Sequence, residues 1–422
     1  MAEPVVIKQT FKEDVLALMA RYSEFGATPE GGVNRLAASS EDKDARNFLC
    51  QWLENHGFTK LIDPAGNIFG VLELDPSQPD TSLFCGSHLD SQPHGGRFDG
   101  TLGVVIACVA GLTLKDMIDR GEIENSYRNY VVACWTSEEG ARFQPSLLGS
   151  RFFAGNLSKE DAWSLTDEEG ISLKQALSDI GYLGTDTPPK PDHYLEVHIE
   201  QGKKLEDAGL SVGLVSSSWG ARKLTLSITG KPDHTGPTPM AVRKDALLAA
   251  SRVIVEVNGL AQRSKDDLHS SVGRLNVEPN SPNTVVSKAE LWIEFRSADE
   301  AQLNAAEEWL QTMSTEISIQ TGCEITQNSR EVRAVVTFDR TANGKIRKTL
   351  DSAAIPNLSL TTIAGHDALQ LQSICPSTLM FVRSKDGISH TPDEFTSDSD
   401  IETAFDASIA ALSALVSQRL PM

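Results

Sequence analysis

The sequence predicts an α/β fold with a mixed sheet, interrupted by a smaller α+β domain. Short, nearly continuous apolar runs at 81–88 and 129–139 flank a helix-length apolar stretch at 101–118, which is the strand–helix–strand order of an α/β domain. From about residue 219 the pattern changes to alternating strands and amphipathic helices. After about residue 328, short apolar runs and a final helix return. One domain is therefore expected to contain the other as an insertion.

The predicted main domain covers 1–218 and 329–422, and the inserted domain covers 219–328. Two βαβ-like halves in the insertion suggest a ferredoxin-like order. Further expected helices lie at 11–25, 41–57 (opened by the cap sequence Ser-Ser-Glu-Asp), 243–262, 300–319 and 400–417. Further expected strands lie at 194–202, 221–230, 289–299, 358–363 and 379–384.

The composition is that of a globular protein of more than one core. The chain has 422 residues, of which 40% are hydrophobic and 23% charged. Its 58 acidic and 38 basic residues give a formal net charge of -20, which argues against binding to nucleic acid or to an anionic membrane surface. The charge argues for solubility and for nothing more specific.

The six cysteines are scattered through mostly apolar segments and form no Cys-x-x-Cys pair. This usage is typical of buried thiols in a reducing compartment. The N-terminal residues lack a basic-then-apolar signal pattern, and the apolar run at 102–114 is shorter than the roughly 20 residues that span a bilayer. We expect a cytoplasmic protein in which this run forms a buried helix.

The stretch GSHLDSQPHGGRFDG at 86–100 places charged side chains among glycines just before that helix. The carboxylate of Asp90 is placed to accept the N–H of one imidazole nitrogen of His88, which leaves the other nitrogen free to bind a metal. Asp99 directly precedes Gly100 and the helix. Its carboxylate could bend back toward the strand ends, or it could cap the helix. Both interpretations are open at this point.

Two adjacent carboxylates, Glu138 and Glu139, follow the second predicted strand. Neighbouring carboxylates repel each other unless a cation or a proton lies between them, so this pair could supply one metal ligand and one general base. The alternative is a solvated acidic turn, because charged residues are usually exposed.

Two more histidines stand near predicted strands. YLEVHIEQG places Glu196, His198 and Glu200 on one face of a strand, and such a polar face is costly to bury without a partner. His390 follows the predicted strand LMFVRS in DGISHTPDE. The set that could bind two divalent cations sharing one aspartate is His88, Asp99, Glu139, His198 and His390.

Seven segments in this order resemble the hydantoinase/carbamoylase branch of the M20 metallopeptidase-like amidohydrolases. They are GSHLDSQPHGGRFDG, WTSEEGARFQPSLLGSRFFAG, LEVHIEQG, HTGPTPM, PNSPNTV, AGHDA and GISHTP. The branch contains N-carbamoyl-L-amino-acid hydrolases, β-ureidopropionases and allantoate amidohydrolases. The resemblance covers nearly the whole chain. It implies a di-metal catalytic domain of phosphorylase/hydrolase-like fold and an inserted ferredoxin-like lid and dimerisation domain.

The resemblance also implies a role for each matching residue. His88 and His198 would bind one metal, Glu139 and His390 would bind the other, and Asp99 would bridge them. Glu138 would act as the general base, and His234 would stabilise the oxyanion. The residues implied to hold the substrate are Gln201, His234, Asn283, Arg296 and His366.

The implied reaction is hydrolysis of the carbamoyl C–N bond of an N-carbamoyl-L-amino acid, releasing the amino acid, ammonia and carbon dioxide. Two divalent ions per subunit are expected. Zinc is the first choice, and manganese, cobalt and nickel are also compatible with imidazole and carboxylate ligands. The implied assembly is a homodimer in which the lid supplies His234 and Asn283 to the active site of the partner.

Three alternatives remain open at this stage. The substrate could be allantoate or N-carbamoyl-β-alanine. The chain could be an M20 aminoacylase or dipeptidase, although GGRFDG, HIEQG and GISHTP favour the carbamoyl branch. It could also be a binding or regulatory protein that kept the fold and lost the activity, against which the complete ligand set argues.

Overall fold

The computed structural model describes residues 8–264 and 267–417, which form two compact units. The first unit comprises the chain up to residue 216, 338–360 and the chain from 365 onward. The second comprises 217–337 and 361–364. It ends later than the expected residue 328 because strand β10 (Glu324–Arg333) pairs antiparallel with β7 (Gly220–Thr229).

The first unit is built on an eight-stranded mixed sheet in the order β1-β2-β4-β3-β5-β12-β6-β11. Strands β4, β3, β5 and β12 are neighbours and run parallel, whereas the pairs β1–β2, β2–β4 and β6–β12 are antiparallel. The sheet confirms the predicted mixed α/β class. Its strands are β1 (Thr59–Ile62), β2 (Ile68–Glu73), β3 (Ser82–His88), β4 (Asn129–Trp135), β5 (His193–Ile199), β6 (Val212–Ser218), β11 (Asn357–Thr362) and β12 (Ser377–Val382).

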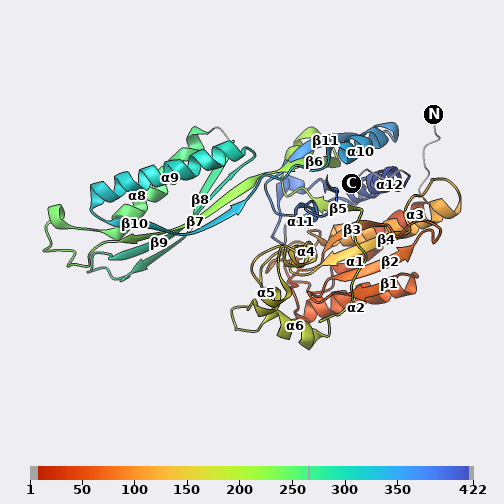
Figure 1. Cartoon of the computed structure of the whole chain (residues 1–422), viewed down its shortest axis with the longest axis horizontal. Coiled ribbons are helices and arrows are strands. Elements are labelled where there is room, and N and C mark those ends of the chain that lie inside the picture. The colour runs from red at the N-terminus through yellow and green to blue at the C-terminus, as the bar shows by residue number, and fades with distance from the viewer. Residues whose placement is uncertain (1–7, 265–266, 418–422) are drawn as a thin grey trace. The chain divides into compact units, whose positions relative to one another are not determined.

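Both faces of the central strands are buried, which explains their continuous apolar runs. Alternation along β3 puts Leu83 and Cys85 into the main core cluster, while Phe84 packs against Phe153. The helices of this unit, several visible around the sheet in Figure 1, are α1 (Gln9–Tyr22), α2 (Ser40–Asn55), α3 (Thr101–Asp119), α4 (Leu148–Phe153), α5 (Lys159–Ser164), α6 (Leu173–Ile180), α7 (Lys204–Ala208), α10 (Arg340–Ser352), α11 (Asp367–Leu371), α12 (Asp398–Val416) and the 3-10 turn η2 (Lys385–Gly387).

Helix α3 is the buried support that the sequence predicts after the glycine-rich loop. It packs against β3, β4 and β5 and also contacts α1 and α12. The helix has 19 residues and is apolar enough on average to cross a membrane by length and composition, but 78% of its most apolar stretch is buried inside the structure. The helix therefore has the burial of a core helix. The six cysteines are free and buried, as the sequence predicts.

The second unit is a four-stranded antiparallel sheet in the order β10-β7-β9-β8. Helices α8 and α9 pack against each other and against the sheet (Figure 1). Strand β9 alternates between buried and partly exposed residues, which is typical of a sheet covered on one face. The remaining elements of this unit are η1 (Met240–Val242), α8 (Ala246–Arg263), β8 (Leu268–Glu278), β9 (Lys288–Ser297) and α9 (Glu300–Thr321).

Candidate metal centre

The carboxyl ends of the four parallel strands bring the predicted ligands together at one edge of the sheet. His88 is the last residue of β3 and His198 is the penultimate residue of β5. Glu138 and Glu139 follow β4, and His390 lies in the loop after β12. In open sheets of this kind the ligand site lies beyond the carboxyl ends of the strands, so the topology accounts for the cluster.

His88, Asp99 and His198 form a buried group able to hold a metal ion. The Nε2 atoms of His88 and His198 lie 3.4 Å and 3.0 Å from Oδ1 of Asp99. Each Nδ1 lies 2.9 Å from a backbone carbonyl oxygen, that of Asp90 for His88 and that of Ile199 for His198. When Nδ1 donates to that carbonyl, the lone pair of Nε2 faces the aspartate oxygen, which is the orientation of a ligating imidazole.

Asp99, Glu139 and His390 form a second such group. Nε2 of His390 lies 3.4 Å from Oδ2 of Asp99 and 3.4 Å from Oε2 of Glu139. The two oxygens of Asp99 thus face different groups, and Asp99 is 4% exposed whereas His390 is 46% exposed. The structure places all five predicted ligands in two groups that share one aspartate.

The donor set fits divalent cations. Nε2 of His88 is buried and has no hydrogen-bond partner among the described residues, although it faces carboxylates of Asp99 and Glu138. An imidazole lone pair and a carboxylate oxygen repel each other unless a proton or a cation lies between them. Each of the two groups combines imidazole nitrogen with carboxylate oxygen, and these are ligands that zinc and related cations take in proteins.

The pKa values of these groups reflect the same crowding. Burial and the carboxylate of Asp99 raise the pKa of Glu139 to about 7. The hydrogen bond with Asp99 raises the pKa of His390 to about 9. Burial lowers the pKa of His88, but the carboxylates of Glu138 and Asp99 outweigh burial, and its net pKa lies well above its usual value. The cluster favours positive charge at its centre, whether carried by protons or by metal ions.

Glu138 belongs to neither ligand group, yet its carboxylate lies at their edge. Oε2 of Glu138 is 3.5 Å from Nε2 of His88. Burial raises the pKa of Glu138 well above its usual value, and the carboxylates of Asp367 and Glu139 add to that shift. A buried carboxyl with a raised pKa beside a cation site has the properties of a proton acceptor.

Asp90 supports the centre in a different way from the one predicted. Its backbone carbonyl accepts the His88 N–H, while its carboxylate oxygen lies 3.9 Å from that nitrogen. The carboxylate instead accepts the backbone N–H groups of Glu138, at 3.1 Å, and Glu139, at 3.2 Å. The predicted carboxylate–imidazole hydrogen bond is therefore wrong, because the turn that carries the glutamates uses both carboxylate oxygens.

The interpretation of Asp99 as a helix cap is also wrong. Helix α3 has Gly100 at its N-cap, and no side chain accepts a capping hydrogen bond there. Gly100 has a φ of 62°, and a Cβ atom at this position would lie 2.4 Å from the His88 ring. Only glycine allows the chain to turn this close to the imidazole and aim Asp99 back at the strand ends.

Buried Arg35 holds both ends of the glycine-rich loop. Its Nε donates to the carbonyl of Leu89 at 2.5 Å, and its Nη2 donates to Oγ1 of Thr101 at 2.8 Å. Neither Arg35 nor Gln92 is among the predicted site residues, although Nε2 of Gln92 donates to Oε2 of Glu139 at 2.9 Å. Gln92 stands within the glycine-rich motif, so its position there was an available signal.

The polar face of β5 is satisfied by hydrogen bonds. Glu196 accepts the backbone N–H of Ala368 at 2.6 Å and the hydroxyl of Ser87 at 3.1 Å. Glu200 accepts two backbone N–H groups at the start of α7. Glu196, His198 and His366 also meet the geometric criterion for a metal group, but both Glu196 oxygens are already engaged, so these contacts are structural.

The predicted substrate contacts lie in both units. Within the first, Nε2 of Gln201 donates to Oδ2 of Asp99 at 2.7 Å, and the ring of His366 lies 4.5 Å from that of His198. Within the second, the segments of His234 and Asn283 are neighbours. Arg296 lies on β9, where its Nε donates to Glu294 at 3.0 Å and its Nη1 to the carbonyl of Ile363 at 3.0 Å.

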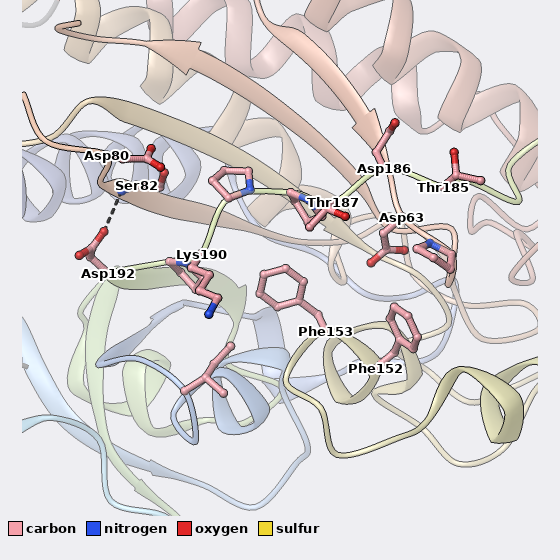
Figure 2. Close-up of a pocket in the computed structure, with 15 residues that line it drawn as sticks. Asp63, Asp80, Ser82, Phe152, Phe153, Thr185, Asp186, Thr187, Lys190 and Asp192 are labelled. Carbon is pink, nitrogen blue, oxygen red and sulfur yellow. Dashed lines mark hydrogen bonds between the residues drawn. The ribbon is translucent and has the colours of Figure 1, made fainter.

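A cavity of about 1090 Å³ lies elsewhere on the first unit, beside the amino ends of β3 and β5 (Figure 2). Phe152 and Phe153 line it, together with carboxylates that already accept backbone hydrogen bonds. Asp192 accepts the N–H of Ser82 at 2.8 Å, and Asp63 accepts two backbone N–H groups of its own turn. These carboxylates hold the fold, and none of the predicted ligands lines the cavity.

The fold and the clustered ligands define an α/β protein with candidate metal groups, and comparison with known proteins identifies its family. The model of peptidase family M20/M25/M40 matches residues 84–414, and the chain belongs to this family. It is 34% identical to an N-carbamoyl-L-amino acid amidohydrolase of Geobacillus stearothermophilus, over 89% of this chain and 92% of the relative. It is 30% identical to an allantoate amidohydrolase of Bacillus subtilis (strain 168), over 94% and 95% respectively.

Comparison with solved structures indicates the hydantoinase/carbamoylase branch of the family. A hydantoinase/carbamoylase family amidase from Burkholderia multivorans matches with a TM-score of 0.85 and 32% identity, covering 98% of this chain and 99% of that chain. The predicted resemblance is thereby confirmed. The chain is an amidohydrolase of the carbamoylase and allantoate amidohydrolase group, whose members act on C–N bonds of linear amides other than peptide bonds.

Proposed function

We propose that this chain hydrolyses the carbamoyl C–N bond of an N-carbamoyl-L-amino acid with two divalent cations per subunit. The observation that carries the proposal is Asp99, whose two oxygens face two separate groups of imidazole and carboxylate donors. His88 and His198 would hold one cation, Glu139 and His390 the other, and Asp99 both. Bound cations would supply a lowered pKa for water and polarisation of the carbonyl group.

Glu138 is the proposed general base. Its carboxylate would take a proton from the attacking water and return it to the nitrogen of the leaving amino acid. The bond between the carbamoyl carbon and that nitrogen breaks, and the carbamic acid formed decomposes to ammonia and carbon dioxide. The buried position and raised pKa of Glu138 support this role.

Side chains outside the ligand groups would position the substrate. Arg296 is proposed to bind the substrate carboxylate through its guanidinium, whose orientation is fixed by hydrogen bonds from Nε to Glu294 and from Nη1 to the carbonyl of Ile363. His234 would donate to the developing oxyanion. Gln201, Asn283 and His366 would fix the rest of the substrate.

The second unit is proposed to be a ferredoxin-like lid and dimerisation domain. Its βαββαβ order and the strand order β10-β7-β9-β8 support the ferredoxin-like part. In the proposed homodimer, this domain supplies His234 and Asn283 to the active site of the partner.

Subunit mixing tests the shared site. An H234A variant and an E138Q variant, each inactive alone, are expected to recover part of the activity after dissociation and joint reassociation, because a mixed dimer contains one intact site. Ammonia release before and after mixing measures the recovery. An absence of recovery, with mixed dimers demonstrated by differently tagged chains, would place the whole site within one subunit.

Ammonia release across a panel of substrates tests the proposed reaction. Protein loaded with zinc or manganese is expected to release ammonia from N-carbamoyl-L-amino acids faster than from N-carbamoyl-β-alanine or allantoate, and a chelator should stop the release. Faster release from N-carbamoyl-β-alanine or from allantoate would mean that this acid is the substrate, within the same group of amidohydrolases. Hydrolysis of N-acyl amino acids or dipeptides alone would favour the aminoacylase alternative, and no hydrolysis at all would favour a binding protein.

A further inference from the structure

Glu394 is buried and is not among the predicted site residues. Its side chain makes direct contact with the backbone at Asp99. The residue is 3% exposed and lies in the loop after η2, four residues beyond His390. Its Oε1 accepts the backbone N–H of Phe98 at 2.9 Å and that of Asp99 at 3.0 Å. These bonds join two segments almost 300 residues apart in the sequence, and each segment carries a proposed metal ligand.

The second oxygen of Glu394 reaches the side chain of Asp99 through a hydroxyl group. Oγ of Ser389 lies 2.8 Å from Oε2 of Glu394 and 3.0 Å from Oδ2 of Asp99. Nε2 of Gln201 donates to the same hydroxyl at 3.1 Å. Glu394 therefore contacts the backbone of Asp99 directly and its carboxylate through one intermediate, on the side of Asp99 that faces His390.

Gly96 provides the space for this contact. A Cβ atom at Gly96 would lie 2.0 Å from the carboxyl carbon of Glu394. The absence of a side chain lets the loop before Asp99 close over the Glu394 carboxylate, which explains one of the glycines in the motif GGRFDG. On the other side, the ring of Phe98 packs edge-on against Phe395 with centroids 6.1 Å apart. The two loops are thus matched in shape as well as in hydrogen bonding.

We propose that Glu394 is a positioning residue that fixes Asp99 and the His390 loop in the register in which Asp99, Glu139 and His390 share a cation. The inference rests on the proposed function, because it concerns the metal centre. Outer partners of ligating carboxylates typically contribute about 10–100-fold to metal affinity. The contribution comes from geometry, since Glu394 itself belongs to neither ligand group.

A buried carboxylate elsewhere in the same unit provides a matched control. Asp63 is 2% exposed and accepts the backbone N–H groups of Ala65 at 2.9 Å and Asn67 at 3.0 Å. It resembles Glu394 in burial and in its two backbone donors, but it contacts none of the proposed ligands. A loss of metal affinity caused by general destabilisation would appear in D63A as well as in E394A.

Competition for Zn²⁺ between the full-length protein and a chromogenic chelator tests the proposal without using activity. In E394A we expect the weaker of two Zn²⁺ affinities to fall by at least about tenfold. E394Q should stay within about threefold of wild type, because its amide oxygen accepts both backbone N–H groups and its amide nitrogen can donate to Ser389. D63A should bind Zn²⁺ like wild type. If E394A does not fold, E394D, which shortens the side chain by one methylene, replaces it.

Each outcome separates this inference from the proposed function. Wild-type protein that binds no Zn²⁺ and releases no ammonia would overturn the proposed function itself. Wild type that binds two Zn²⁺ ions while E394A, or E394D in its place, binds them equally well would overturn only the role of Glu394. An equal loss of Zn²⁺ affinity in D63A, or a loss in E394Q as large as in E394A, would also overturn the role of Glu394. Neither result is expected if Glu394 acts by accepting the backbone N–H groups of Phe98 and Asp99.

Discussion

The E138Q variant is expected to lose turnover while keeping its metal. Glutamine has nearly the same shape as glutamate but cannot accept the proton of the attacking water, so kcat should fall by about 10²–10⁴-fold, the usual contribution of a positioned acid or base. Both ligand groups remain complete without Glu138, and its backbone N–H can still donate to Asp90. Steady-state ammonia release and metal analysis of the same preparation measure the two effects.

The neighbouring glutamate provides the control for this prediction. E139Q makes the same chemical change one residue along the chain, in a side chain that faces His390 at 3.4 Å. It should lose the cation of the second group as well as activity. Metal loss in E138Q and retention in E139Q would mean that the roles of the two glutamates are reversed.

The D99N variant is expected to lose metal more completely than any other single substitution in the centre. Asp99 is the residue that the two proposed metal-binding groups share. Its two carboxylate oxygens face three imidazoles at 3.0–3.4 Å. Removing its charge should weaken binding by more than the roughly 10–100-fold that the loss of an outer partner costs. Activity should fall below detection for the same reason.

D90N is the matched control for D99N. Asp90 lies in the same loop and is also buried, but its carboxylate accepts hydrogen bonds from the backbone N–H groups of Glu138 and Glu139. This carboxylate lies 3.9 Å from Nδ1 of His88, the nitrogen that faces away from the metal groups. D90N should therefore retain both cations with reduced affinity. Chelator competition with both variants, after circular dichroism has shown that each is folded, makes the comparison. Equal retention of metal by D99N and D90N would contradict the shared position of Asp99.

Much of the fold was predictable because the main strands and helices carry strong patterns. Strands β3 and β4 are buried on both faces, so their apolar runs are continuous, and the helix between them is apolar along most of its length. Elements with weak sequence patterns were missed. Helices α4 and α5 have six residues each, too few for helical periodicity, and β8 is largely exposed and shows little alternation.

The candidate site was predictable where its residues follow strand ends, and it was missed or misjudged where backbone groups decide the contacts. His88, Glu139 and His198 are recognisable by residue type and position. The roles of Asp90 and Glu394 depend on which backbone N–H groups lie within reach, and those groups belong to segments distant in the sequence. No periodicity or spacing in the sequence carries that information.

The number of divalent cations per chain tests the di-metal centre most directly. Wild-type protein purified after growth with added zinc or manganese can be freed of loosely bound metal by gel filtration and then analysed by plasma mass spectrometry together with its protein concentration. The two groups that share Asp99 predict two cations per chain. One cation or fewer per chain, after supplementation with each of zinc, manganese, cobalt and nickel, would contradict a centre bridged by Asp99.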